Sequence, residues 1–119
     1  MTRVTGIGGV FFKAEDPKAL YAWYEKHLGV KCDPHGGATF PGVAGAITAW
    51  SIFKKDTAYF GPGQQSVMIN YTVENLDALL DALRAEGVWI DEKREDADYG
   101  RFAWIKDLEG NRIELWEPK

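Results

Sequence analysis

An internal repeat constrains this sequence more than any other feature, because the first half of the chain matches the second at an offset of about 58 residues. In the first half, Asp16 can cap a helix that Gly29 ends, and in the second half Asn75 and Gly87 stand at the matching places. A period near 60 residues is too long for a solenoid, and two copies are too few. The repeat therefore predicts two similar units, each with one helix on one sheet face. Since neither unit buries much surface alone, their sheets are expected to curve together around a cleft.

The first half is predicted to contain one helix and four strands. Pro17 follows the Asp16 cap at the first helical position, and Leu20, Trp23 and Tyr24 recur at helical spacing. The glycines at positions 6, 8 and 9 indicate either close approach of a ligand or another backbone, or a weak edge strand. The predicted elements are the strand Thr5–Ala14, the helix from Asp16 to His27, and the strands Val30–Asp33, Thr39–Phe40 and Ala44–Lys54.

The second half repeats this order. A leucine stripe at positions 76, 79, 80 and 83 predicts the helix Leu76–Glu86, and the polar segment Glu95–Gly100 is expected to be a loop. The predicted strands are Ser66–Val73, Val88–Lys93, Arg101–Lys106 and Arg112–Trp116. Together the halves predict an α+β fold in a single domain of two tandem β-α-β-β-β modules, about residues 1–60 and 64–119, that form a curved mixed sheet around a cleft.

Composition narrows the partners of the chain. The net charge of −4 without a basic block argues against nucleic acid, and no stretch approaches the roughly 20 apolar residues of a membrane span. Cys32 is the only cysteine in the sequence, so no disulfide can form within the chain, and the N-terminus lacks the apolar core of a signal peptide. We therefore expect a cytoplasmic protein that binds neither nucleic acid nor membrane.

The last strand carries an acidic side chain in an unusual setting. Ile113 and Leu115 form one apolar face, and Arg112, Glu114 and Trp116 form the other. A carboxylate beside a tryptophan is either solvated at a rim or held in a cleft for use. At a rim, pairing of Glu114 with Arg112 would contribute under about 1 kcal/mol.

The closing run, D-L-E-G-N-R-I-E-L-W-E-P from Asp107 to Pro118, resembles the C-terminal signature of the vicinal oxygen chelate superfamily. That superfamily includes glyoxalase I, extradiol dioxygenases, methylmalonyl-CoA epimerase and bleomycin-resistance proteins. Its fold consists of the same duplicated module, so the resemblance covers nearly the whole chain. It implies a C2 homodimer. In the family's metalloenzymes it also implies a divalent metal, and Glu114 stands at a ligand position.

The other ligands of such a metal site are missing from the sequence. The positions that match them are Gly9 or Val10, Trp50 and its neighbours, and Val67 or Met68. A catalytic divalent metal needs about three protein ligands, and these side chains do not supply them. His27 is predicted on a helix and His35 in a turn, where structural or surface roles are expected. We expect no metal or other cofactor, and a divalent metal held partly by Glu114 stays as the alternative.

Strand alternation and the resemblance together define a candidate ligand site around Glu114. The residues expected to share its face are Trp50, Asn70, Phe102, Trp104, Arg112 and Trp116. Aromatic walls with few polar groups suit a small, partly apolar or aromatic ligand, and a cationic ligand could lie on the indole rings. Tryptophans in strands are also common core residues, so plain packing stays as the alternative.

Three functions fit these residues. The first is metal-free binding or sequestration of a small molecule, which the resemblance to bleomycin-resistance proteins implies. The second is a glyoxalase-type lyase or isomerase, in which burial beside Trp116 raises the pKa of Glu114 so that it serves as catalytic general base, or in which Glu114 ligates a metal. The third is a structural or regulatory module whose cleft is filled by its own aromatic side chains.

Overall fold

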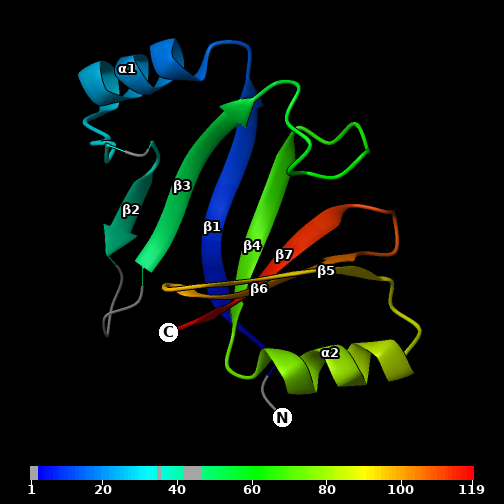
Figure 1. Cartoon of the computed structure of the whole chain (residues 1–119). Helices are drawn as coiled ribbons and strands as arrows, with labels where there is room; N and C mark the ends of the chain where they lie inside the picture. Colours follow the sequence, from blue (N-terminus) through cyan, green and yellow to red (C-terminus); the bar gives the residue numbers. More distant parts are fainter. Residues whose placement is uncertain (1–2, 35, 42–46) are drawn as a thin grey trace. The chain divides into compact units, whose positions relative to one another are not determined.

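The computed structural model describes residues 3–34, 36–41 and 47–119, which form a mixed sheet with two helices (Figure 1). The strands are β1 (Val4–Ala14), β2 (Ala38–Pro41), β3 (Ile47–Lys54), β4 (Val67–Val73), β5 (Ile90–Ala97), β6 (Gly100–Lys106) and β7 (Arg112–Pro118), and the helices are α1 (Pro17–Leu28) and α2 (Leu76–Ala85). The strand order β2-β3-β1-β4-β7-β6-β5 confirms the predicted α+β class. The chain divides into two units: Gly9–Val67, and Met68–Lys119 together with the N-terminal residues up to Gly8.

The unit Gly9–Val67 contains α1 and three strands. From Gly9 onward β1 pairs in parallel with β3, and β2 pairs antiparallel with β3. Asp16 Oδ1 accepts a hydrogen bond from the Ala19 amide at 3.1 Å, and Gly29 follows α1 with a φ of 69°. The predicted cap and the predicted glycine stop of this helix are therefore confirmed.

One predicted strand in this unit is wrong. Residues 30–33 form no strand, because the chain turns there instead: the Gly36 amide donates to the Asp33 carbonyl at 3.0 Å, and the Asp33 amide donates to the Gly37 carbonyl at 2.9 Å. Gly36 and Gly37 both have positive φ, which only glycine adopts without strain. The strand predicted from Ala44 is described only from Ile47, and His35 lies outside the described residues.

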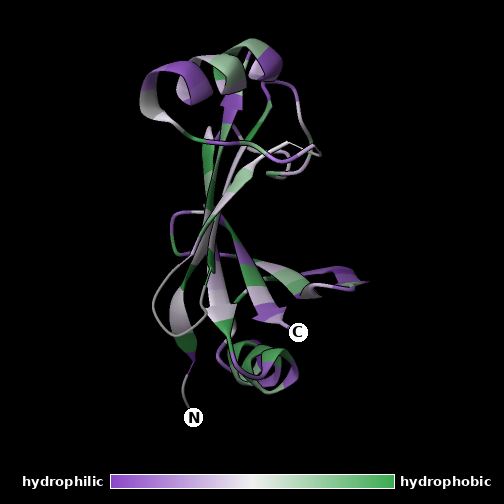
Figure 2. Ribbon diagram, turned by 90° about the vertical axis from the view of Figure 1, so that its left-hand side faces the viewer, coloured by the Kyte–Doolittle hydropathy of each residue, from purple (hydrophilic) through white to green (hydrophobic). Residues whose placement is uncertain are grey.

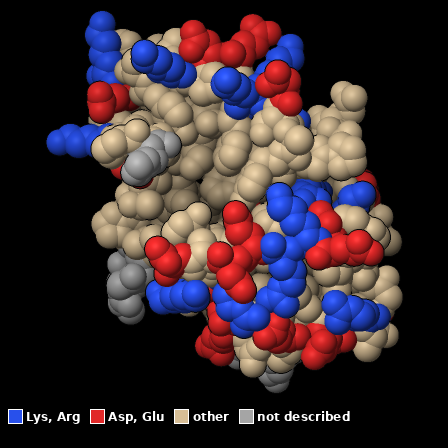
Figure 3. Space-filling model, viewed as in Figure 1, with Lys and Arg blue, Asp and Glu red and all other residues tan. Residues whose placement is uncertain are grey.

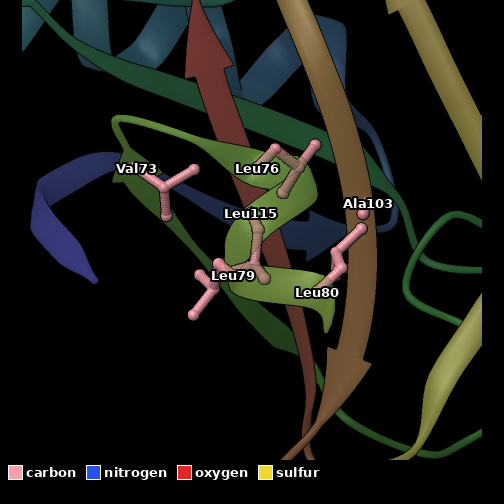
Figure 4. Packing of buried hydrophobic residues seen from close by; sticks show 6 residues of the cluster. All are labelled: Val73, Leu76, Leu79, Leu80, Ala103 and Leu115. Carbon is pink, nitrogen blue, oxygen red and sulfur yellow. The ribbon is translucent and has the colours of Figure 1, made fainter. Parts of the chain in front are cut away.

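The other unit contains α2 and the remaining strands. β4 pairs in parallel with β7. β6 pairs antiparallel with β7 on one side and with β5 on the other. The apolar face of α2 packs on one face of this sheet, as predicted. Hydrophobic and hydrophilic residues alternate along the helix (Figure 2). The resulting core cluster contains Val73, Leu76, Leu79, Leu80, Ala103 and Leu115 (Figure 4). No described helix is long and apolar enough to cross a membrane.

The strand β5 is longer than predicted. The segment expected as a polar loop continues the strand to Ala97, and a short turn then leads to Gly100, which pairs with Ala97. Charged residues can occupy this strand because it lies at the sheet edge, where exposed charges also discourage pairing with other chains.

An ion-pair network joins β5 and β6 to the N-terminus of α2. Asp77 accepts hydrogen bonds from Arg94 at 2.8 Å and from Arg101 at 2.9 Å, and acidic and basic side chains interleave over this surface (Figure 3). Glu117 of β7 also caps α2, because its Oε1 accepts a hydrogen bond from the Leu76 amide at 2.7 Å. The last strand therefore holds the start of α2.

Candidate functional site

Two side chains from the neighbouring strands meet at Glu114, on the sheet face opposite α2. Asn70 of β4 and Trp104 of β6 both pair with Glu114 of β7 in the strand register. Asn70 Nδ2 donates to Glu114 Oε1 at 2.6 Å, and Trp104 Nε1 donates to Oε2 at 3.0 Å. Glu114 is only 1% exposed, so the rim alternative is wrong for this carboxylate. The structure thus brings together the three residues that strand alternation had grouped.

A second row of side chains lies next to the first on the same face. Phe102 and Trp116 pair across β6 and β7, and their rings are parallel within 4° with centroids 5.9 Å apart. Trp116 Nε1 donates to the Tyr99 carbonyl at 3.0 Å, and the exposed Tyr99 ring meets Phe102 edge-on. Tyr99 was not predicted as a site residue, because it falls in the segment expected to be a polar loop.

Asn70, Glu114 and Trp104 form a row across three strands, called here the Glu114 row. Arg112 lies on the side of this row away from Phe102 and Trp116. Its guanidinium forms an ion pair with Asp91 of β5 at 3.0 Å and lies 5.4 Å from the centre of the Trp104 ring. A hydrogen bond from the Lys93 amide, assisted by Arg112, holds the pKa of the Asp91 carboxyl below its usual range. Nothing in the sequence distinguishes Asp91 from the other acidic residues of β5, so its role could not be predicted.

Gly8 lies where β1 meets this face, and its lack of a side chain is required there. A Cβ at Gly8 would overlap Asn70 Oδ1 and would lie 2.8 Å from the Trp116 ring. The glycines of the first strand were expected to mark either close approach of a ligand or another backbone, or a weak edge strand. At Gly8 the groups that approach closely are side chains of β4 and β7.

Asn70 leaves one polar atom unsatisfied. Its side chain is 2% exposed, and its Oδ1 has no hydrogen-bond partner among the described residues. A buried acceptor without a donor costs about 1–3 kcal/mol, and native proteins rarely tolerate one without a reason. The fold therefore leaves a buried acceptor, without a hydrogen-bond partner among the described residues, beside the buried carboxylate.

Trp50 packs under α1 rather than on an open sheet face. Its ring centre lies 4.9 Å from that of Tyr24 and 5.9 Å from that of Tyr21, both on α1. The alternation of β3 was correctly predicted, but the face that carries Trp50 is the one that the helix covers. Trp50 and Glu114 belong to different units, and the expectation that Trp50 lines the face of Glu114 stays a prediction.

The residues around Glu114 do not fit a divalent metal. Both carboxylate oxygens accept hydrogen bonds, one from the Asn70 amide nitrogen and the other from the Trp104 indole nitrogen. Neither of these two nitrogen atoms can ligate a cation. The Asn70 oxygen would add one oxygen ligand, which with Glu114 falls short of about three. Within residues 3–34, 36–41 and 47–119, no group of three or more His, Cys, Asp or Glu is placed to hold a metal ion.

Solved structures with this fold carry different activities. A variant of Streptomyces coelicolor methylmalonyl-CoA epimerase in complex with 2-nitronate-propionyl-CoA is 15% identical, with a TM-score of 0.76 over 97% of this chain and 98% of that chain. Methylmalonyl-CoA epimerase from Mycobacterium tuberculosis is 22% identical, with a TM-score of 0.69 over 100% of this chain and 91% of that chain. NAD-dependent benzaldehyde dehydrogenase from Legionella pneumophila is 15% identical, with a TM-score of 0.61 over 93% of this chain and 98% of that chain. At these identities the likeness shows the fold alone.

The sequence itself identifies the family. No curated protein matches the chain significantly. The family model of the Glyoxalase/Bleomycin resistance protein/Dioxygenase superfamily matches residues 6–115, which include both helices and the Glu114 row. The chain belongs to the Glyoxalase/Bleomycin resistance protein/Dioxygenase superfamily.

Proposed function

We propose that this protein binds a small, partly apolar or aromatic molecule on the Glu114 face, without a metal. The observation that carries the proposal is the buried Oδ1 of Asn70, which has no partner among the described residues and lies beside Glu114. A ligand with an N–H or O–H group would supply the donor that this atom lacks. The rings of Phe102, Trp104 and Trp116 would supply apolar contact.

The charges around Trp104 favour a neutral ligand over a cationic one. Lys93 Nζ lies 5.5 Å from the centre of the Trp104 ring, and the Arg112 guanidinium lies 5.4 Å from it. A cation placed on this indole would therefore meet two like charges. We accordingly propose a ligand with a neutral hydroxyl, phenol or amide donor in place of a cationic ligand.

Calorimetric titration of the purified chain tests this proposal with matched ligand pairs, such as phenols and their O-methyl ethers. We expect phenols to bind at least about tenfold more tightly than the ethers, since the ethers leave the acceptor unsatisfied. The variant Asn70→Leu should abolish this preference, whereas Trp50→Phe should preserve it. Equal affinity for both members of every pair, or a preference that survives in Asn70→Leu, would overturn the proposal.

A second candidate function, proton transfer next to a carbonyl group, is favoured by the fixed orientation of Glu114. Each carboxylate oxygen has its own nitrogen donor, and positioned bases are what such transfers need. Glu114 would take a proton from the carbon beside the carbonyl, which leaves the electron pair in an enolate, and would return the proton to the neighbouring carbon. This transfer would make the protein an isomerase of the glyoxalase type. Hydrogen–deuterium exchange into acyl thioesters, followed by NMR, distinguishes the two candidates: exchange that Glu114→Gln abolishes supports the isomerase, and binding without exchange supports the binding protein.

A further inference from the structure

A bulge in β5 places two side chains of opposite charge beside Trp104. The register of β5 against β6 slips at this point, so residues 91–93 of β5 lie opposite Trp104 alone. The Lys93 amide donates a hydrogen bond to Asp91 Oδ1 at 3.0 Å, which holds the bulge. Bulges are common next to active sites, where they re-aim a side chain. Here the bulge directs both Asp91 and Lys93 to the face of the sheet that carries Trp104.

The two charges of the bulge differ in their surroundings. Asp91 forms an ion pair with Arg112 at 3.0 Å. Lys93 is exposed, and its Nζ lies 5.5 Å from the centre of the Trp104 ring. Within the part of the chain that the structure describes, Lys93 forms no ion pair. The bulge therefore presents an ammonium group to this face while its carboxylate is already paired.

Two other carboxylates lie on the same face. Glu114 is buried and accepts hydrogen bonds from Asn70 and Trp104. Glu95 pairs with Phe102 in the strand register, so it lies one row beyond the Glu114 row. Neither forms an ion pair with Lys93 among the described residues. An anion from outside the chain would therefore have little competition for this lysine.

The contact between Lys93 and Trp104 is of a kind that an anion can replace. A cation–π contact at an exposed position is weak, whereas a hydrogen bond between an ammonium group and a carboxylate is among the stronger polar contacts in proteins. The lysine side chain has a flexible stem, so its ammonium group can turn from the ring to a ligand. This movement would also uncover the indole of Trp104, which is only 1% exposed, for contact with an apolar part of the ligand.

We infer that Lys93 determines specificity by binding the carboxylate of an aromatic hydroxy acid whose hydroxyl group donates to Asn70 Oδ1. This inference rests on the proposed function, because the ligand lies on the same face and uses the same acceptor. Asn70 and Trp104 lie on either side of Glu114, so their backbones are two strand spacings, roughly 10 Å, apart. A phenol with a carboxylate on a short para side chain can reach from the Asn70 acceptor to a lysine beside Trp104.

Calorimetric titration of the full chain with para-hydroxyphenylacetate and its amide tests the inference, because only the acid is charged at neutral pH. We expect the acid to bind at least about fivefold more tightly than the amide. Lys93→Met should abolish this preference, and Lys93→Arg should keep most of it. Lys106→Met is the matched control, since it removes the same charge from a lysine whose Nζ lies 4.5 Å from the centre of the Trp89 ring. The control should keep the preference, and circular dichroism checks that all variants are folded.

The para-methoxy acid separates this inference from the proposed function. Lys93→Met should still bind the hydroxy acid more tightly than the methoxy acid, because that difference depends on Asn70. Equal affinity for the acid and its amide, with the preference for the hydroxyl intact, would overturn this inference and leave the proposed function standing. A preference for the acid that survives in Lys93→Met, or that Lys106→Met also abolishes, would overturn the role of Lys93. Lack of binding by every probe would overturn both.

Discussion

Trp104 donates a hydrogen bond from Nε1 to Glu114 Oε2 at 3.0 Å, and each residue is only 1% exposed. Taking a carboxylate out of water is costly unless hydrogen-bond donors replace the lost hydration. The indole of Trp104 is therefore both a large core side chain and one of the donors that make a buried Glu114 tolerable. This double role separates Trp104 from the other tryptophans of the chain.

Replacing Trp104 by Phe should destabilise the protein by about 2–4 kcal/mol, because the change removes a donor to a buried carboxylate and also leaves a small cavity. Urea unfolding followed by circular dichroism measures the free energy of unfolding. Trp50→Phe is the matched control, because it makes the same substitution at a tryptophan with no hydrogen bond to a carboxylate. It should cost about 1 kcal/mol. Equal losses in the two variants would show that the hydrogen bond to Glu114 contributes little.

Adding a methyl group at Gly8 should also be costly. The new Cβ would overlap Asn70 Oδ1 and crowd Trp116, so Gly8→Ala should lower the free energy of unfolding by about 1–3 kcal/mol. Gly63 provides the control, because a Cβ there meets no atom within 4 Å. Gly63→Ala should be neutral or slightly stabilising, since alanine restricts the unfolded chain. If the two variants have the same stability, the packing around Gly8 is not as described.

The Asp91 carboxylate, which accepts a hydrogen bond from the Lys93 amide and pairs with Arg112, should make stability depend on pH in the acidic range. The pKa of Asp91 is lower in the folded chain than its unfolded value of about 3.9. Its contribution is therefore complete above the unfolded pKa and is lost as the pH falls through the folded pKa. Asp91→Asn should destabilise the protein at pH 7 by about 1–3 kcal/mol, and the difference from the unmodified chain should shrink towards pH 2.

Urea unfolding at several pH values checks this expectation. An Arg112→Met variant serves as the control, because Asp91→Asn should cost much less when the guanidinium is already absent. A difference that stays constant between pH 7 and pH 2 would contradict the assignment to the Asp91 carboxylate.

Trp50 should matter for stability and not for ligand binding. Its ring packs with Phe12, Tyr21 and Tyr24 under α1, so Trp50→Ala should cost about 2–4 kcal/mol. Affinity for a phenolic ligand should stay within about twofold of the unmodified chain, whereas Trp116→Ala should weaken it at least about tenfold. Loss of ligand binding in a folded Trp50→Ala variant would contradict this expectation and would place Trp50 in the ligand site.

The helices could be predicted because their signals are local. The caps at Asp16 and Asn75 and the leucine stripe of α2 each involve residues within a few positions of one another. Strand ends were predicted less well. Whether residues 30–33 or 95–97 pair depends on partners elsewhere in the chain, and the turn at Gly36 and the edge position of β5 decided those cases.

The centre of the candidate site could also be predicted, because alternation fixes which residues share a face once neighbouring strands are paired. Asn70, Trp104 and Glu114 are grouped in this way. The contacts of Asp91 and Gly8 could not be predicted, since they depend on side-chain reach between segments distant in sequence. The contact of Trp50 with α1 could not be predicted either, because alternation gives two faces of a strand but does not say which face a helix covers.

The unit that holds Glu114 joins the strand segment before Gly8 to the last strand, β7, through β4. During synthesis, the sheet that contains the start of β1 is therefore complete only after β7 has been made, up to Pro118. Until then, the cap of α2 by Glu117 is also missing. A ribosome-bound chain that lacks β7 should consequently expose the leucines of α2, and chaperone binding to such stalled chains should fall sharply once β7 has emerged.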